Sequence, residues 1–329
     1  MKRALKIFGK VMLSILVLII SLLAGTIIYI SIPLDAPASP DNGVVQIRMK
    51  YNEFNILVIT DTHFMGMPLG VDGRTERLIA GLVYETDPDL IMMLGDNVAT
   101  PFNHAAWRRM IRFMDGFNIP WAPLFGNHDS KGKATFNYLA QMLLTQSTNT
   151  IFRWGHDGLG MPGNYKIEIV DSHGSSVHNF FMLSSPQSPW FRTYYFPYTQ
   201  EQLDWLIYAN DSNIPATLML HQPLPIFYHA WNDGTHKWGG KREGVMSAVT
   251  DPGIWDEING GDLQNIGRII AGHDHINDFK VKYQGVYMMY TPATNRNLGI
   301  FGAYGRIAGA SLLTVNSDGT VFIHEPILR

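Results

Sequence analysis

The fold is decided by the stretch FNILVITDTH, which occupies residues 54–63. Its first seven residues are mostly apolar and β-branched, which is typical of a strand buried inside a sheet. The apolar run ends at Asp61, and His63 follows two residues later. Alternate side chains of an extended chain point to the same side, so this carboxylate and this imidazole can face one metal ion together. We therefore expect a buried strand that presents two metal ligands at its carboxyl end.

Two further predicted strands end in the same way. The apolar run over residues 90–94 is followed by Asp96, and the run over 121–125 is followed by Asn127 and His128. Helical spacing of apolar residues is found over 74–85, 105–117 and 134–144. Alternating strands and helices predict parallel βαβ units, whose functional groups gather beyond the carboxyl ends of the strands. The three polar strand ends therefore predict one shared site.

The second half of the chain is richer in predicted strands. We expect a helix over residues 200–209 and strands over 164–170, 179–183, 216–220, 266–271, 286–290, 310–315 and 320–324. Two of these strands end at histidines, namely His221 and the pair His273 and His275. The expected fold class is α/β, a four-layer sandwich of two mixed β-sheets packed face to face and flanked by helices. The candidate metal ligands then lie along one edge of the sandwich.

The residues at these strand ends suit the hydrolysis of phosphate esters. A phosphate ester repels an attacking hydroxide, and two cations about 3.5–4 Å apart can bind both the phosphate oxygens and the attacking water. Oxygen and imidazole ligands suit Fe, Mn or Zn. Cysteine is absent, which excludes disulfides, thiolate zinc sites and a cysteine nucleophile. The sequence therefore indicates a centre of two metal ions with one bridging carboxylate.

In their order along the chain, these motifs resemble those of the calcineurin-like metallophosphoesterase family, which includes the purple acid phosphatases. The resemblance covers residues 53–329. It implies a hydrolase that depends on two metal ions and uses a hydroxide that bridges them. It also implies a ligand set: Asp61, His63 and His275 for the first metal, Asn127, His221 and His273 for the second, and Asp96 as the bridge. By the same resemblance, His128 is the candidate catalytic residue, a proton donor or charge stabiliser beside the phosphate.

Smaller motifs resemble the short purple-acid-phosphatase-like branch of plants and fungi. They lie at residues 155–165, 242–244 and 276–279. The purple enzymes have a metal-bound tyrosine three residues after the bridging Asp, where serine–threonine phosphatases have an Asp, and here that position is Ala99. We therefore expect no tyrosinate–iron colour, and iron is less certain as the metal. For Asp129 two interpretations stay open, since it can orient the neighbouring histidine or only cap the turn.

The N-terminus has the pattern of a membrane anchor. Four basic residues, Lys2, Arg3, Lys6 and Lys10, precede an uncharged run over residues 11–32. At about 1.5 Å per residue this run spans roughly 33 Å as a helix, which is enough to cross the bilayer core. The basic flank predicts a cytoplasmic N-terminus, so the rest of the chain is expected outside the cytoplasm.

Two other interpretations of this segment stay open. A signal peptide could be cleaved near Ala36-Pro37-Ala38, although its apolar region is usually only about 7–15 residues long. The segment could also be a buried helix of a soluble protein. The predicted organisation is a basic flank and anchor over 1–32, a linker over 33–52 and the phosphoesterase domain over 53–329.

Composition bounds the class of the protein and its partners. Apolar residues make up 46% of the chain and charged residues 16%, so a folded core is expected. The net charge is −3, which argues against binding to the backbone of nucleic acids. The expected partners are a phosphate-ester substrate and, through the N-terminal helix, a membrane.

Two alternative functions stay open. One is a metal-free pseudo-enzyme that keeps the fold as a binding module, against which the complete set of candidate ligands and His128 argues. The other is a phosphodiesterase that acts on cell-envelope material or lipid headgroups, which a membrane anchor would favour.

Several aromatic residues are candidates for a substrate rim. The loop over residues 223–244 either packs on its own aromatic side chains or grips the organic part of a substrate, and its aromatic residues are Phe227, Tyr228, Trp231 and Trp238. A weaker case concerns Trp190, Tyr194 and Tyr195. We expect Tyr283, Tyr287 and Tyr290 to pack on sheets, and we treat the remaining histidines as ordinary residues: His104, His156, His173, His178, His229, His236 and His324.

Overall fold

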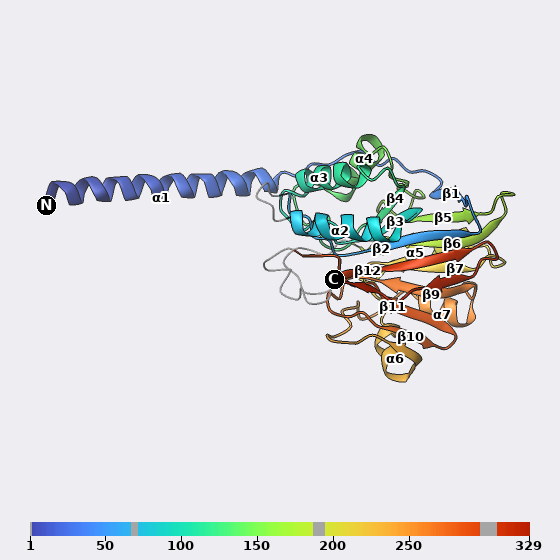
Figure 1. Ribbon diagram of the computed structural model, residues 1–329. Helices are drawn as coiled ribbons and strands as arrows, with labels where there is room; N and C mark the ends of the chain where they lie inside the picture. The colour runs from blue at the N-terminus through green and yellow to red at the C-terminus, as the bar shows by residue number, and fades with distance from the viewer. Residues whose placement is uncertain (1, 67–71, 187–194, 297–307) are drawn as a thin grey trace.

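The computed structural model describes residues 2–66, 72–186, 195–296 and 308–329. Two β-sheets lie face to face, helices cover their outer faces, and one long helix projects from the body (Figure 1). The predicted α/β sandwich of two mixed sheets is confirmed.

The six-stranded sheet is built around the stretch of residues 54–63. Its order is β13 (Val321–Ile323), β12 (Gly309–Asn316), β2 (Glu53–Ile59), β3 (Leu90–Leu94) and β4 (Trp121–Leu124), with β14 (Ile327–Leu328) paired to β12. β2, β3 and β4 are parallel, whereas β12 is antiparallel to β2. Every residue of β3 is buried, which explains its unbroken apolar sequence. The carboxyl ends of the three parallel strands therefore meet at one edge.

The eight-stranded sheet carries most of the second half of the chain. Its order is β1 (Val44–Arg48), β5 (Tyr165–Val170), β6 (Ser176–Leu183), β7 (Ala216–Leu220), β9 (Ile266–Ala271), β11 (Val286–Tyr290), β10 (Lys280–Tyr283) and β8 (Thr235–Trp238). β6, β7, β9 and β11 are parallel to one another. This sheet therefore also gathers the carboxyl ends of neighbouring strands at one edge.

The helices cover the two outer faces of the sandwich. α2 (Gly73–Thr86), α3 (Asn103–Asp115) and α4 (Phe136–Gln146) lie over the six-stranded sheet (Figure 1). α5 (Gln200–Ala209), α6 (Ile226–Asp233) and α7 (Ile254–Gly260) belong to the cluster of buried apolar residues on the far side of the eight-stranded sheet. A second cluster joins the facing sides of both sheets and the helices α2 to α4. The sheets are thus held by apolar burial, which leaves the polar strand ends at the edge.

Two parts of the predicted organisation are wrong. Residues 44–48 of the expected linker form β1, which pairs in parallel with β5. The expected loop over 223–244 contains α6 and β8, and β8 pairs with β10. Both strands are short edge strands next to proline or glycine, so their local sequences resemble loops, and only pairing with distant strands makes them regular.

The long helix α1 (Lys2–Ser31) projects away from the body (Figure 1). Within the part of the chain that the structure describes, it is the one helix long and apolar enough to cross a membrane, over Lys6–Ser31, and it buries none of that span against the protein. Its last turn is attached to the domain, because Nζ of Lys133 donates hydrogen bonds to the carbonyl oxygens of Tyr29 and Ile32 at 2.6 and 2.9 Å. The helix is thus a candidate membrane span that is joined to the domain at one end.

Candidate metal centre

The seven candidate ligands follow five strands whose carboxyl ends meet between the two sheets. Asp61 and His63 follow β2, Asp96 follows β3, and Asn127 follows β4. The remaining three, His221, His273 and His275, follow β7 and β9 of the other sheet. Backbone hydrogen bonds join these strand ends, such as Asp61 N–H to the Gly95 carbonyl at 3.0 Å and Gly272 N–H to the His221 carbonyl at 3.0 Å. The predicted meeting of the ligands at one edge is therefore observed.

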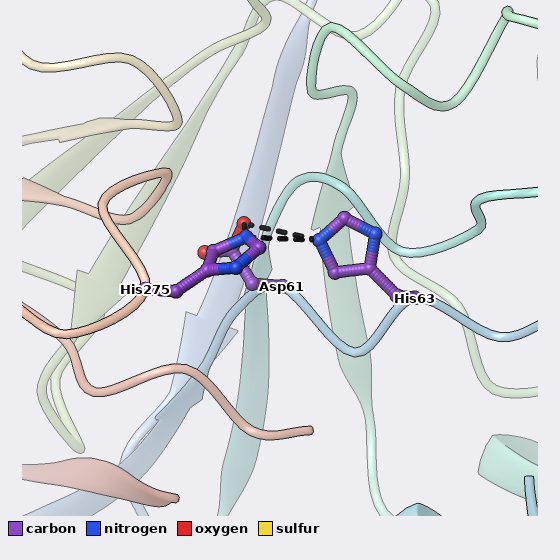
Figure 2. A group of neighbouring side chains, drawn as sticks. All are labelled: Asp61, His63 and His275. Carbon is purple, nitrogen blue, oxygen red and sulfur yellow. Dashed lines mark hydrogen bonds and ion pairs between the residues drawn. The ribbon is translucent and has the colours of Figure 1, made fainter. Parts of the chain in front are cut away.

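Asp61, His63 and His275 form the first group of donor atoms. Their side chains point toward one another from the end of β2 and from the turn after β9 (Figure 2). Nε2 of His275 lies 3.3 Å from Oδ1 of Asp61 and 3.1 Å from Nε2 of His63. Oδ1 of Asp61 is buried and makes no hydrogen bond. A cation bound here would contact this oxygen and the two facing imidazole nitrogens.

Asp96, His221 and His273 form the second group. Nε2 of His221 lies 3.3 Å from Oδ1 of Asp96 and 3.2 Å from Nδ1 of His273. Asn127 joins this group, since its Oδ1 is 3.2 Å from Nε2 of His221. The four donors therefore converge on one point, as in the first group.

Asp96 faces both groups at once. While its Oδ1 is close to His221 of the second group, its Oδ2 lies 3.9 Å from Nε2 of His63 in the first group. The backbone N–H of His128 donates to Oδ1 at 2.7 Å, which holds the carboxylate in place. The position suits a carboxylate that bridges two ions.

The spacing of the donors fits metal ions. Two ligands that are each about 2.1 Å from one ion are separated by roughly 3.0–3.4 Å at right or tetrahedral angles. The neighbouring donors are 3.1–3.3 Å apart in five pairs, and Nε2 of His63 lies 3.6 Å from Oδ1 of Asp61. Carboxylate, amide and imidazole donors without a thiolate suit Fe, Mn or Zn. The residues present therefore fit a centre of two metals, while the role of each residue as a ligand stays a prediction.

Electrostatics keep the two carboxylates ionised. Burial by itself would raise the pKa of Asp61 and Asp96, but the imidazoles around them, that of His221 first, hold both pKa values well below the usual range. For His221, burial acts to lower the pKa, whereas Asp96 and Asp61 raise it to about 9. Burial lowers the pKa of His273 to about 3. Ionised carboxylates and unprotonated imidazoles are the forms that bind metals, so Asp61, Asp96 and His273 are in the binding form, whereas His221 would release a proton when a metal binds.

The ligand backbone is strained, and one part of the sequence argument needs correction. Asp61, His63, Asp96 and His273 have φ of 53°, 45°, 46° and 74°, in the left-handed region that costs roughly 1–3 kcal/mol for a residue with a side chain. Asp61 and His63 do face the same group, but they do so in a left-handed turn, not on an extended chain. Strain of this kind persists where the surrounding structure holds the residue in place.

Asp129 caps the turn that follows β4. Its carboxylate accepts hydrogen bonds from the N–H groups of Gly126 and Val98 at 2.8 and 2.9 Å and from the side chain of Asn97 at 3.1 Å. Burial and the charge of Asp96 raise the pKa of Asp129 well above its ordinary value. Of the two interpretations left open by the sequence, capping is the one that the structure bears out.

His128 lies at the opening of the site. Its side chain is 25% exposed, and its Nε2 is 3.9 Å from Oδ2 of Asp96. Burial lowers the pKa of His128 to about 4, an effect that Asp96 opposes and His63 adds to. The ring is thus beside the candidate metal centre and open to solvent, as expected for a group that meets a substrate.

The aromatic candidates divide into two kinds. Phe227 and Trp231 pack on Phe279, so within the expected rim these two belong to the core. Tyr228 is exposed. Tyr195 lies edge-on against the ring of His273, with centroids 4.6 Å apart, which favours Tyr195 as part of a substrate rim. Two other rim candidates of this segment, Trp190 and Tyr194, lie outside the described residues.

The turn after β9, which carries His273 and His275, is stabilised by residues that the sequence alone did not indicate. The carboxylate of Asp274 accepts hydrogen bonds from the hydroxyl of Tyr290 at 2.5 Å and from the N–H of Met246 at 3.2 Å. Oε1 of Glu243 accepts from the N–H of Ile276 at 2.8 Å. The sequence does carry a signal, because residues 242–244 and 276–279 are two of the family-like motifs, and the structure pairs one with the other.

Comparisons with known proteins agree with this geometry. A family model described as calcineurin-like phosphoesterase matches residues 54–277. The chain is 23% identical to probable inactive purple acid phosphatase 14 of Arabidopsis thaliana, over 90% of this chain and 82% of that protein. It is 28% identical to probable inactive purple acid phosphatase 28 of the same plant, over 77% and 72%. A dimetal phosphatase from Danio rerio has a similar fold, with a TM-score of 0.51, 11% identity and coverage of 82% and 98%.

Replacement of Gly126 by alanine is expected to disturb the bridge. A Cβ at this position would overlap the backbone nitrogen and the carboxylate of Asp96. We predict that Gly126→Ala weakens metal binding by about 10–100-fold, as changes to groups that orient ligands do. Its free energy of unfolding should fall by about 1–3 kcal/mol. Metal content after dialysis and thermal unfolding measure both effects.

Gly267→Ala is the matched control, since a Cβ there meets nothing within 4 Å. It should leave metal content and stability unchanged. Wild-type metal affinity in Gly126→Ala would contradict the assigned position of Asp96.

Proposed function

Since the chain belongs to the calcineurin-like phosphoesterase family, we propose that it is a hydrolase of phosphate esters that depends on two metal ions. The observation that carries the proposal is the position of Asp96, whose two carboxylate oxygens face two separate groups of donors. The first metal would be held by Asp61, His63 and His275, and the second by Asn127, His221 and His273. Candidate metals are Fe, Mn and Zn, and Ala99 supplies no tyrosinate that would select iron.

The reaction breaks one bond to phosphorus. The oxygen of water bonds to phosphorus, the bond from phosphorus to the ester oxygen breaks, and the alcohol leaves with a proton. Two cations bound at the centre would activate the water and offset the charge on the phosphoryl oxygens. The ionised Asp61 and Asp96 and the imidazoles beside them would hold these cations in fixed positions, so that the cations need no rearrangement as the charge develops.

His128 is assigned the remaining role, that of proton donor to the leaving alcohol or of charge stabiliser. Its position next to Asn127, its partial exposure and its contact with Asp96 support this role. Burial disfavours its protonated form. A bound phosphate would oppose that effect, since an opposite charge within about 4–6 Å favours the charged form of an imidazole.

The second candidate function is a binding module without catalysis. It is favoured by the names of both plant relatives, which describe them as probable inactive phosphatases. In this chain all candidate ligands and His128 are present, and the groups converge at metal-like spacing. Metal content, together with turnover of a chromogenic monoester and a chromogenic diester, separates the two functions. Two bound metals without turnover of either substrate would favour the module.

We further propose that α1 is retained as an anchor and that the domain lies outside the cytoplasm. Cleavage after Ala38 would remove Tyr29 and Ile32, whose carbonyls accept the hydrogen bonds of Lys133. With α1 in place Lys133 is only 6% exposed, and the loss would remove both of these acceptors and the Tyr29 ring that covers its ammonium. It would also remove Leu34, whose backbone pairs with that of Lys133 and Thr135.

Variants at His128 and Asn127 should separate chemistry from metal binding. We predict that His128→Ala keeps two metals and the fold but loses about 10²–10⁴ in rate, the usual contribution of general acid catalysis. The loss should be smaller for substrates with very acidic leaving groups, which need no proton. Asn127→Ala should instead lose the second metal. Loss of a metal in His128→Ala, or equal slowing of both kinds of substrate, would not support the assigned role.

Topology can be tested on intact cells that carry the full chain. Protease added outside should digest the domain after Ser31 and leave the first ten residues protected, because the basic flank stays in the cytoplasm. Immunoblots with tags at each end report the result. Digestion only after lysis would contradict the external domain, and a soluble mature form that begins near Ser39 would contradict the retained anchor.

A further inference from the structure

The end of α1 is attached rigidly to the domain. Besides its hydrogen bonds to the carbonyls of Tyr29 in α1 and of Ile32 just after it, Nζ of Lys133 lies 3.7 Å from the centre of the Tyr29 ring. The backbone continues the attachment, since Leu34 N–H donates to the Lys133 carbonyl at 2.6 Å and Thr135 N–H to the Leu34 carbonyl at 2.9 Å. A cation at the carbonyl end of a helix also interacts favourably with the helix dipole. The anchor therefore fixes the orientation of the domain, which a flexible tether would not do.

The loops that hold the anchor also carry the candidate metal centre. Lys133 belongs to the turn that begins with Asn127 and His128, and the side chain of Asn103 joins Asp129 to Ala134 in this turn by hydrogen bonds to both carbonyls at 2.9 Å. Lys133 is five positions after His128, so their Cα atoms lie within about 18 Å. The site is thus one short turn away from the end of the membrane helix.

The edge that carries the site is on the anchor side of the body. β14, at the C-terminus, pairs with the first residues of β12. The start of β12 pairs with the end of β2, and Asp61 comes directly after β2, so the C-terminus marks the edge that carries the site. Figure 1 shows the C-terminus on the side of the body from which α1 projects. The carboxyl ends of the strands therefore face the membrane that α1 would cross.

The length of α1 brings its last turn into the headgroup layer. The span Lys6–Ser31 has 26 residues and is about 39 Å long, compared with a hydrocarbon core of about 30 Å and a bilayer of about 40–45 Å with headgroups. Tyr29 is in this last turn, and its ring lies 6.3 Å from that of Phe102, which is 42% exposed. Exposed aromatic rings are typical of the membrane interface.

The rim beside the two histidines after β9 is partly apolar. Met246, whose N–H binds the carboxylate of Asp274 between the two histidines, is 42% exposed. Phe196, which follows the Tyr195 that contacts His273, is 39% exposed. Such side chains offer no hydrogen bonds to a polar substrate, and they would pack against the apolar part of a lipid.

We propose that the natural substrate is a phosphate ester of a membrane lipid, hydrolysed at the surface of the bilayer that holds α1. The proposal rests on the proposed hydrolase function. Water adds its oxygen to the phosphorus, the bond to the ester oxygen breaks, and the lipid or headgroup alcohol leaves with the proton. The attachment at Lys133 would hold the site toward the lipid surface, and the apolar rim would meet the lipid as its headgroup enters.

The test uses the full chain in vesicles that contain phosphatidic acid, a monoester, or phosphatidylglycerol, a diester, and a soluble chromogenic monoester and diester as references. An insertion of about ten Gly and Ser residues after Ser31 replaces the rigid attachment by a flexible tether about 17–19 Å long. We expect the wild type to hydrolyse one of the two lipids. The insertion should lower that rate at least about tenfold and leave the soluble rates within about twofold.

Controls keep the outcomes distinct. The same insertion after His173, in an exposed turn, should leave all rates unchanged. A second variant covers the case in which the insertion after Ser31 disturbs folding. Lys133→Met should lower the rate on the lipid and leave the rates on the soluble esters unchanged. Lys237→Met, at an exposed position, is its matched control and should change neither rate. Hydrolysis of soluble esters without hydrolysis of either lipid, or an unchanged ratio of lipid to soluble rate in both attachment variants, would overturn the lipid proposal. Absence of all turnover would instead overturn the proposed function.

Discussion

The rest of the site depends on one carboxylate, that of Asp96, which faces both groups of donors. Placing it there requires three strands to end together, a left-handed backbone at Asp96 itself and a glycine at position 126 that leaves room for it. The neighbouring imidazoles outweigh burial and keep the carboxylate ionised. Without cations, these strained and buried polar groups would destabilise the folded state, so their presence is best explained by metal binding.

The same edge of the sandwich connects to α1, the candidate membrane span. The turn that begins with Asn127 and His128 ends at Lys133, which binds the last carbonyls of α1. Site and anchor are therefore parts of one local structure and not separate modules joined by a linker. This connection supports the proposal of a substrate at a bilayer surface, and it explains why a lysine is buried where an apolar residue would pack more easily.

Much of the fold and of the site could be predicted from the sequence, because both depend on strong local patterns. Buried strands such as residues 90–94 have unbroken apolar sequences, and each polar strand end is marked by glycine, Asp, Asn or His. The family resemblance based on these motifs is confirmed. β1 was missed because a short edge strand becomes regular only by pairing with a distant partner. The attachment at Lys133 was hidden for a similar reason, and the sequence could not decide between the two roles of Asp129, since both questions depend on contacts that form only after folding.

The central claim, that two metals share Asp96, is tested most directly by electron paramagnetic resonance of the protein loaded with Mn²⁺. Two ions about 3.5–4 Å apart interact magnetically, whereas distant ions do not. The account predicts two Mn²⁺ per chain with a coupled spectrum in the wild type, and loss of that coupling with weaker binding in Asp96→Asn, because a neutral amide cannot offset the repulsion of two cations. One bound ion, two ions without coupling, or a coupled pair that survives in Asp96→Asn would contradict it.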